Sequence, residues 1–195
     1  MINNIILASK SGVRKKILNQ NSINCEVVPA NVDEELIKES LLKEKETPRT
    51  IAKNLAELKA NKVSEKRANK LVLGADSVID LNGVIISKPK NREEAFNILQ
   101  RLNGKTHQLI SSVCVSKNGY MIWNFTDAST LTMKQLNSDE IKLYLTKIKD
   151  KELYACGVYQ IESGGRSLFS KIEGNEDTIM GLPAKQIKEY LSNLK

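Results

Sequence analysis

Two Asn-Gly dipeptides constrain the fold of this 195-residue chain more than any other feature. Asn82-Gly83 and Asn118-Gly119 each stand between β-prone runs, which occupy 78–79 and 84–86 around the first pair and 107–116 and 120–125 around the second. An Asn-Gly pair in this setting favours a tight hairpin turn between antiparallel strands. We therefore expect a sheet that is mixed rather than purely parallel.

Strand and helix patterns alternate along the rest of the chain. Short apolar runs predict buried strands at 4–8, 24–29 and 71–75, and a β-rich run predicts a further strand at 127–133. Apolar residues at helical spacing predict helices over 12–20 and 47–63, from Asn91 to Gly104, from Ser138, and after Gly181-Leu182-Pro183. The pattern favours an α/β fold. No repeat or Pro/Gly-rich linker divides the chain, so residues 1–195 are expected to form a single domain.

Composition narrows the chemistry available to such a fold. The chain has one histidine, which excludes an HExxH helix and any site that needs several imidazoles. An enzyme of this composition must rely on carboxylates, hydroxyls, lysines or a bound metal. The three cysteines, Cys25, Cys114 and Cys156, are far apart and form no C-x-x-C pair. Without such a pair a zinc ribbon is excluded, and we interpret the three cysteines as reduced, buried thiols.

The net charge and the hydropathy of the chain indicate which partners and which cellular location to expect. Lys and Arg exceed Asp and Glu by 30 to 23, which gives a formal charge of +7. Acidic residues are interspersed throughout and aromatic residues are only 5% of the chain, so we expect no nucleic-acid partner. The N-terminus lacks the basic region of a signal peptide, and no apolar stretch is long enough to span a membrane. A cytoplasmic protein without a membrane partner is the expectation.

Residues 7–15 form the first candidate binding segment. A strand ends in Ser9 and Ser11 and passes into a helix that begins with basic residues, among them Arg14. Free backbone N–H groups, hydroxyls and cations at such a junction suit a phosphate. The alternative is a helix cap followed by a solvated basic face. The residues do not decide whether Ser9 or Ser11 would face the ligand.

The second group of candidates consists of charged residues at element ends. Asp76 directly follows the apolar run 71–75, at the end of an expected strand, where open α/β sheets place functional groups. It is a candidate base or metal ligand, with a turn or cap role as the alternative. Lys59 and Lys88 are candidates whose alternative is ordinary solvated surface. The acidic residues 33–35 read as a solvated turn, although two carboxylates there suit a hard cation.

A glycine-containing segment at 154–165 is the third candidate. Its glycines permit positive φ and close approach of a ligand, and Glu162 lies beside them. The alternative is a simple bend. The single histidine, His107, begins a strand and has no companion for a catalytic triad, so we assign it a structural role.

Several short motifs stand in a recognisable order: LASKS at 7–11 with Arg14, VDE at 32–34, LAELKA at 55–60, GADSV at 74–78, SKP at 87–89, GKTH at 104–107, the Gly157 loop, IEG at 172–174 and GLP at 181–183. Together they cover nearly the whole chain and resemble the Maf family of nucleotide pyrophosphatases. The resemblance implies an elongated mixed sheet with two lobes around a cleft, related to the inosine triphosphatases. It also implies hydrolysis of a nucleoside triphosphate between the α- and β-phosphates, and an association with arrest of septum formation.

The resemblance also implies roles for individual residues. Asp76 matches the proton acceptor that activates water, and Glu34 together with Asp76 matches a site for a divalent cation, Mg²⁺ or Mn²⁺. The polar shell around the triphosphate is matched by four residues: Ser9, Arg14, Lys59 and Lys88. Phosphoryl-type chemistry needs charge neutralisation and positioning, which these residues supply without histidine. The oligomeric state stays open, with a homodimer as one alternative.

Three departures from the family pattern concern the base. Val13 stands where the family often has Arg, and Ser77 and Glu162 stand where the pyrimidine-preferring branch has Thr and Gln. A carboxylate only accepts hydrogen bonds, so Glu162 suits a base edge with two N–H donors, such as guanine or 7-methylguanine. We expect a guanine-type base in a noncanonical or modified nucleotide. The alternatives are a dTTP/UTP-preferring enzyme of the same family and a non-catalytic nucleotide- or RNA-binding regulator of cell division.

Overall fold

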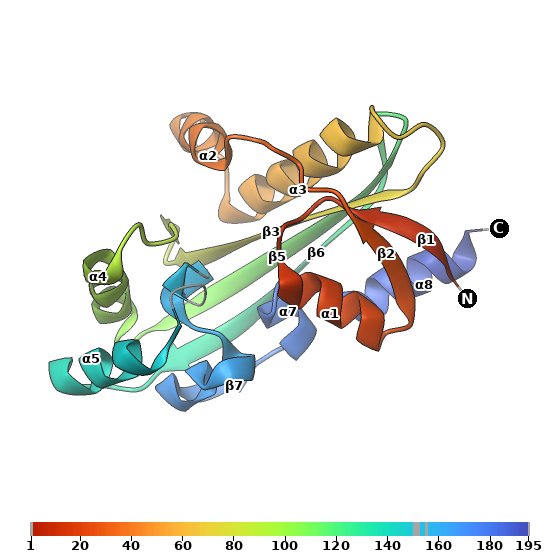
Figure 1. The fold of residues 1–195 in the computed structure, drawn as a ribbon. Helices are drawn as coiled ribbons and strands as arrows, with labels where there is room; N and C mark the ends of the chain where they lie inside the picture. The colour runs from red at the N-terminus through yellow and green to blue at the C-terminus, as the bar shows by residue number, and fades with distance from the viewer. Residues whose placement is uncertain (1, 150–152, 155, 195) are drawn as a thin grey trace.

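The two predicted hairpins lie at the centre of a seven-stranded mixed sheet (Figure 1). The computed structural model describes residues 2–149, 153–154 and 156–194. Its strands are β1 (Ile2–Leu7), β2 (Ile23–Val27), β3 (Val72–Leu81), β4 (Val84–Ile86), β5 (Thr106–Lys117), β6 (Tyr120–Met133) and β7 (Phe169–Glu173). Their order is β2-β1-β3-β5-β6-β7, and β4 pairs with β3. Only the β1–β2 and β1–β3 pairs are parallel, which confirms a mixed sheet.

Both Asn-Gly turns have the backbone that their sequence favours. Asn82 and Asn118 have φ of 54° and 52°, and the glycines that follow them have φ of 84° and 86°. Positive φ at both central residues matches the twist of the flanking strands. The first turn joins β3 to β4, and the second sets the register of the two longest strands, β5 and β6, which pair over nearly their whole length.

Helices cover both faces of the sheet. They are α1 (Gly12–Gln20), α2 (Glu34–Lys43), α3 (Pro48–Ser64), α4 (Arg92–Leu102), α5 (Ser138–Lys147), α7 (Glu176–Ile179) and α8 (Ala184–Asn193). Figure 1 shows α3 along one face of the long strands and α7 and α8 on the other. The predicted caps are present, since Thr47 accepts from the Thr50 N–H and Asn91 from the Glu94 N–H. No helix of the described chain is long and apolar enough to cross a membrane.

The structure corrects two local expectations. Residues 127–133 continue β6 instead of forming a separate strand, because no turn interrupts the pairing with β5. The acidic residues 33–35 are not a solvated turn but the start of α2, with Asp33 as its cap. The sequence signal for α2 is weak because Leu36 and Leu42 are exposed and the residue that the helix buries is a lysine, Lys38.

The sheet carries a hydrophobic core at each end, which gives the molecule two lobes. One core joins β1 and α1 to α8, through buried residues such as Leu7, Leu18 and Ile187. The other joins α4 and α5 to β7 and contains Leu99, Ile141 and Phe169. Strands β3 and β5 contribute buried residues to both cores, so they run through both lobes.

The middle of β3 lies open along one edge. Its pairing with β1 ends at Leu73 and its pairing with β4 begins at Ile79. Among the described residues, 74–78 therefore pair with a strand on one side only, which is β5. Along this stretch, side chains alternate between the two faces of the sheet. Gly74 faces α3 so closely that a Cβ atom there would lie 2.7 Å from the Ala60 nitrogen.

His107 lies in the second core, as its structural assignment predicted. The ring is 2% exposed, its Nε2 atom lies 2.9 Å from the Tyr159 hydroxyl, and its centroid lies 6.0 Å from that of Phe169. Its Nδ1 atom is buried and has no hydrogen-bond partner among the described residues. Burial lowers the pKa of His107 from 6.5 to about 4, because the charged imidazolium would lose its hydration.

This burial predicts a pH dependence of folding. The unfolded chain binds a proton at His107 near pH 6.5 and the folded chain only near pH 4, so stability is full above pH 6.5 and falls as the pH drops toward 4. We expect the free energy of unfolding, measured by urea titration, to decrease by about 2 kcal/mol between pH 7 and 5. His107→Gln should abolish this slope, because the chain has no other histidine. An unchanged slope in the variant would contradict the assignment.

Candidate active site

The open edge of β3 lines a cavity of about 940 Å³. All nine residues that the sequence predicted as a site line this cavity: Ser9, Val13, Arg14, Glu34, Lys59, Asp76, Ser77, Lys88 and Glu162. They come from β1, α1, α2, α3, β3 and the loop segments after β4 and before β7. The fold thus brings together side chains that are up to 153 positions apart in the sequence, from Ser9 to Glu162.

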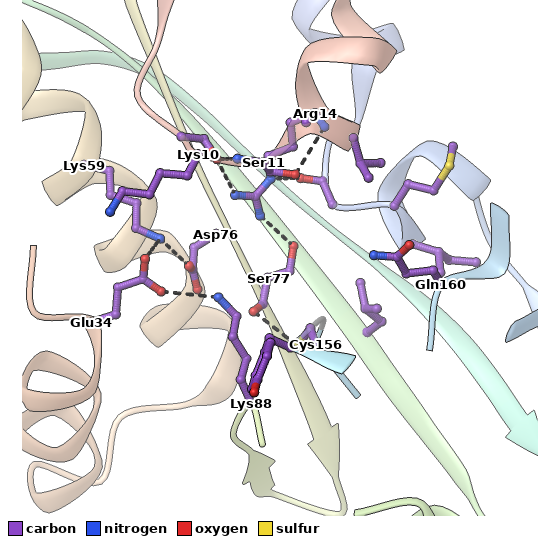
Figure 2. A pocket seen from close by; sticks show the side chains of 18 of the residues that line it. Lys10, Ser11, Arg14, Glu34, Lys59, Asp76, Ser77, Lys88, Cys156 and Gln160 are labelled. Carbon is purple, nitrogen blue, oxygen red and sulfur yellow. Dashed lines mark hydrogen bonds and ion pairs between the residues drawn. The ribbon is translucent and has the colours of Figure 1, made fainter. Parts of the chain in front are cut away.

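A buried cluster of three charged side chains forms one end of the cavity (Figure 2). The Lys59 ammonium lies 2.7 Å from Asp76 Oδ1 and 2.8 Å from Glu34 Oε1. Lys59 and Asp76 are almost fully buried, and the side chain of Glu34 is 30% exposed. Lys88, at the rim, lies 3.7 Å from the other Glu34 oxygen. Lys59 is therefore the cation that holds the two carboxylates at this end of the cavity.

The surrounding lysines keep Glu34 ionised. Burial alone would raise its pKa, but the ammonium groups of Lys59, Lys88 and Lys38 outweigh burial and lower the pKa to about 2. Asp76 differs from Glu34 because one of its two carboxylate oxygens makes no contact within the described chain that satisfies it. Its Oδ2 atom is buried and has no hydrogen-bond partner among the described residues. A buried carboxylate oxygen without a partner is costly unless it serves a ligand, a water or a cation.

Arg14 closes the open edge of β3 from the α1 side. Its guanidinium donates to the carbonyls of Ala75 and Gly181, each at 2.9 Å, and to the hydroxyls of Ser9 and Ser77, each at 3.2 Å. These four contacts leave one of the five guanidinium N–H groups for a ligand. Burial lowers the pKa of Arg14, although Asp76 and Glu34 act in the opposite direction. Arg14 lines the cavity and also ties together the segments that form it.

The two serines after β1 have different roles in the protein. Ser11 caps α1, since its hydroxyl accepts from the Arg14 N–H. The hydroxyl of Ser9 accepts from the Ser11 N–H and from the Arg14 guanidinium. Both serines line the cavity, so the geometry leaves either of them within reach of a ligand there.

Ser77 belongs to a chain of hydrogen bonds that links α1, β3, β5 and α7. Its hydroxyl accepts from Arg14 and lies 2.8 Å from the Ser111 hydroxyl, which donates to the Thr178 carbonyl. Because the Ser111 proton is used on Thr178, the Ser77 proton must point to Ser111. The hydroxyl of Ser77 can therefore accept one further hydrogen bond from a ligand but has no proton to donate.

The other end of the cavity is formed by short 3₁₀ turns, Cys156–Val158 and Ile161–Ser163. Gly157 and Val158 both have positive φ, 75° and 63°, which is unusual for a β-branched residue. This backbone places Tyr159, Gln160 and Glu162 along the cavity. The amide oxygen of Gln160 accepts from the Ser163 hydroxyl at 3.2 Å, which leaves its NH₂ group for a ligand (Figure 2).

The sequence reasoning missed four residues that belong to this region. Lys10, Cys156 and Gln160 line the cavity, and Lys38 lies buried close to Asp76, which acts to raise the pKa of the lysine against the effect of burial. The motif spacing supplied a signal for Lys10 and Gln160 only, because each stands within two residues of a predicted site residue.

Two expectations need correction. Asp76 does not follow the end of a strand but lies within β3, and it lines the cavity because the neighbouring β1 ends early. The three cysteines are free, but only Cys114 is fully buried. Cys156 is partly buried, lines the cavity and donates to the Ser77 carbonyl at 3.6 Å. Burial raises the pKa of its thiol, so the thiol form is favoured.

The residues present suit a divalent cation bound together with phosphate. No group of three or more acidic, histidine or cysteine side chains in the described chain could hold a metal ion alone. Two carboxylates are available, Glu34 and Asp76, and Asp76 Oδ2 has no protein partner among the described residues. One or two carboxylates plus substrate phosphates are the usual ligands of Mg²⁺.

The chain is similar to known proteins over nearly its whole length. Residues 4–194 match the family model described as Maf-like protein. A nucleoside triphosphate pyrophosphatase from Pelagibacter ubique (strain HTCC1062) is 68% identical over the full length of both chains. A 7-methyl-GTP pyrophosphatase from Brucella suis biovar 1 is 38% identical, over 92% of this chain and 90% of that protein. A solved HAM1 protein from Coxiella burnetii aligns over 97% of this chain and 98% of its own, with 12% identity and a TM-score of 0.48. The family match and the full-length relative show that this chain belongs to the Maf family.

Proposed function

We propose that this chain hydrolyses nucleoside triphosphates between the α- and β-phosphates, releasing a nucleoside monophosphate and pyrophosphate. The observation that carries the proposal is the unpartnered Asp76 Oδ2 atom beside Lys59 and Glu34, in a cavity lined by cations. The names of the relatives from Pelagibacter ubique and Brucella suis agree with it.

Asp76 is the proposed proton acceptor. Its Oδ1 atom is held by Lys59 at 2.7 Å, so the carboxylate has a fixed orientation, and its buried Oδ2 atom has no hydrogen-bond partner among the described residues. A water molecule next to Oδ2 would transfer its proton to this oxygen as it attacks the α-phosphorus. Lys59 is proposed to orient Asp76 through the ion pair between its ammonium and Oδ1.

The cations of the cavity neutralise the substrate. A triphosphate concentrates negative charge that increases on the leaving pyrophosphate during the reaction, and fixed cations stabilise that charge. Lys88 is placed for this role because its ammonium is half-exposed at the rim, 3.7 Å from Glu34. Ser9 and Arg14 hold the loop between β1 and α1 against the same cavity.

A divalent cation, Mg²⁺ or Mn²⁺, would be held by Glu34 and Asp76 together with the phosphates. When bound, it supplies further charge neutralisation and orients the phosphates. The structure favours this set because Glu34 stays ionised down to a pH of about 2 and Asp76 has an oxygen without a protein partner among the described residues.

The base is proposed to be of the guanine type. Glu162 offers two acceptor oxygens and the Gln160 NH₂ group offers donors at the same end of the cavity. Guanine has the complementary edge, one carbonyl acceptor followed by two N–H donor groups. Ser77, which can only accept, gives no donor to the O4 atom of uracil or thymine. The 7-methyl-GTP pyrophosphatase relative is consistent with this assignment.

Asp76→Asn tests the reaction. We expect pyrophosphate release from nucleoside triphosphates to fall by at least about a hundredfold, because the amide cannot accept the water proton. Circular dichroism and thermal unfolding should remain close to wild type, since the amide can still accept from Lys59. Asp139→Asn makes the same chemical change at a 94% exposed position on α5 and should keep full activity. Near-wild-type turnover by Asp76→Asn would refute Asp76 as the base.

Metal removal gives a second test. We expect EDTA to abolish pyrophosphate release and Mg²⁺ or Mn²⁺ to restore it, because without the divalent cation the carboxylates of Glu34 and Asp76 repel the triphosphate. Unfolding of the protein without nucleotide should be little affected by EDTA, since no described cluster holds a metal by itself. Full turnover in EDTA would exclude metal dependence.

The base assignment predicts a ranking of substrates. We expect kcat/KM to be higher for GTP or 7-methyl-GTP than for UTP or dTTP. Glu162→Gln should move the ratio of guanine to uracil substrates by about tenfold or more toward UTP, because the second acceptor for the guanine N–H groups is lost. A wild-type preference for UTP or dTTP would contradict the assignment and leave the proposed reaction intact.

A further inference from the structure

A count of the positive charges in the cavity singles out Lys10. Four cationic side chains line the cavity: Lys10, Arg14, Lys59 and Lys88. Three of them are engaged by protein acceptors. Arg14 donates to two carbonyls and two hydroxyls, Lys59 bridges two carboxylates, and Lys88 pairs with Glu34. Within the described part of the chain, Lys10 has neither an ion pair nor a hydrogen bond.

The position of Lys10 fixes which part of a ligand it can reach. Lys10 lies between the two serines after β1, directly before the first residues of α1. Figure 2 shows its side chain at the end of the cavity that holds Lys59 and Glu34, with Gln160 at the opposite end. A ligand with its base beside Gln160 and Glu162 would therefore extend its phosphates toward Lys10.

The local backbone leaves this space open. Gly12, two residues after Lys10, has no atom within 4 Å of the position of a Cβ atom. Val13, the next residue, lines the same cavity and contributes no charge. A solvent-exposed ammonium without a carboxylate partner beside an open cavity is free to bind an anion without first breaking a contact within the protein.

We propose that Lys10 binds the terminal phosphates of the triphosphate and holds the leaving pyrophosphate. This inference rests on the proposed function and adds a phosphate-binding residue to it. Lys10 acts in binding, because it lies outside the cluster of Asp76, Lys59 and Glu34 that is proposed to activate water. Its contribution is charge-assisted hydrogen bonding to phosphate oxygens.

The first test compares Lys10→Ala with the wild type. We expect KM for the triphosphate and the inhibition constant of pyrophosphate to rise by about tenfold at low salt, the effect of one charge-assisted contact. The inhibition constant of the nucleoside monophosphate should not change, because this product lacks the terminal phosphates. Lys16→Ala removes the same charge from an exposed position on α1 outside the cavity and should leave all three constants unchanged. An equal rise in both product constants would refute the assignment.

A second substitution tests whether the lost charge alone explains the weaker binding of pyrophosphate. Val13→Arg places a new cation on the cavity wall three residues away, so the double variant with Lys10→Ala should recover much of the lost pyrophosphate affinity. A loss caused by a distorted loop would not be recovered by this second substitution.

Direct binding separates this proposal from the proposed reaction. Calorimetric titration with tripolyphosphate measures the contact without any turnover. Weaker binding to Lys10→Ala than to wild type supports the role of Lys10 even if the wild type releases no pyrophosphate, in which case the proposed reaction alone fails. Equal binding to both proteins, or none to the wild type, overturns the role of Lys10 whatever the turnover.

Discussion

An interior strand with one bare edge is the constraint on which the site depends. Backbone carbonyls cannot be left buried without hydrogen bonds, and the open stretch of β3 exposes two of them between the ends of β1 and β4. Arg14 binds the Ala75 carbonyl and the Cys156 thiol binds the Ser77 carbonyl. The side chains that complete the sheet are therefore the walls of the cavity. Structure and binding site share the same contacts, so they cannot be altered independently.

The electrostatics of the cavity follow from the same arrangement. Two carboxylates and one lysine buried at close range are stable only because their charges oppose one another. Lys59 satisfies Glu34 and Asp76 together, and Lys38 and Lys88 add charge from α2 and from the rim. The lysines keep Glu34 ionised without a metal ion, and Asp76 Oδ2 has no hydrogen-bond partner within the described chain.

Local signals predicted much of this fold. The two Asn-Gly turns, the Thr47 and Asn91 caps and the apolar spacing of α3 and α8 are properties of a few consecutive residues, and they agree with the structure. The motifs likewise gathered nine residues that line one cavity. The features that the sequence did not predict depend on contacts between distant parts of the chain. The place of Asp76 within β3 depends on where β1 ends, and α2 is held by the ion pairs of Glu34 together with only two partly buried apolar residues, Ile37 and Leu41. The free NH₂ group of Gln160 depends on the contact of its amide oxygen with the Ser163 hydroxyl, which the motif spacing does not indicate.

The two lobes are joined by β3 and β5, which pass without interruption from one core to the other. A hinge between the lobes would have to bend this hydrogen-bonded ladder, which resists deformation along its length. The paired strands therefore fix the distance between the two ends of the cavity. If the base and the phosphates lie as proposed, a nucleotide with one phosphate fewer would occupy the base end of the cavity or reach Lys10, but not both.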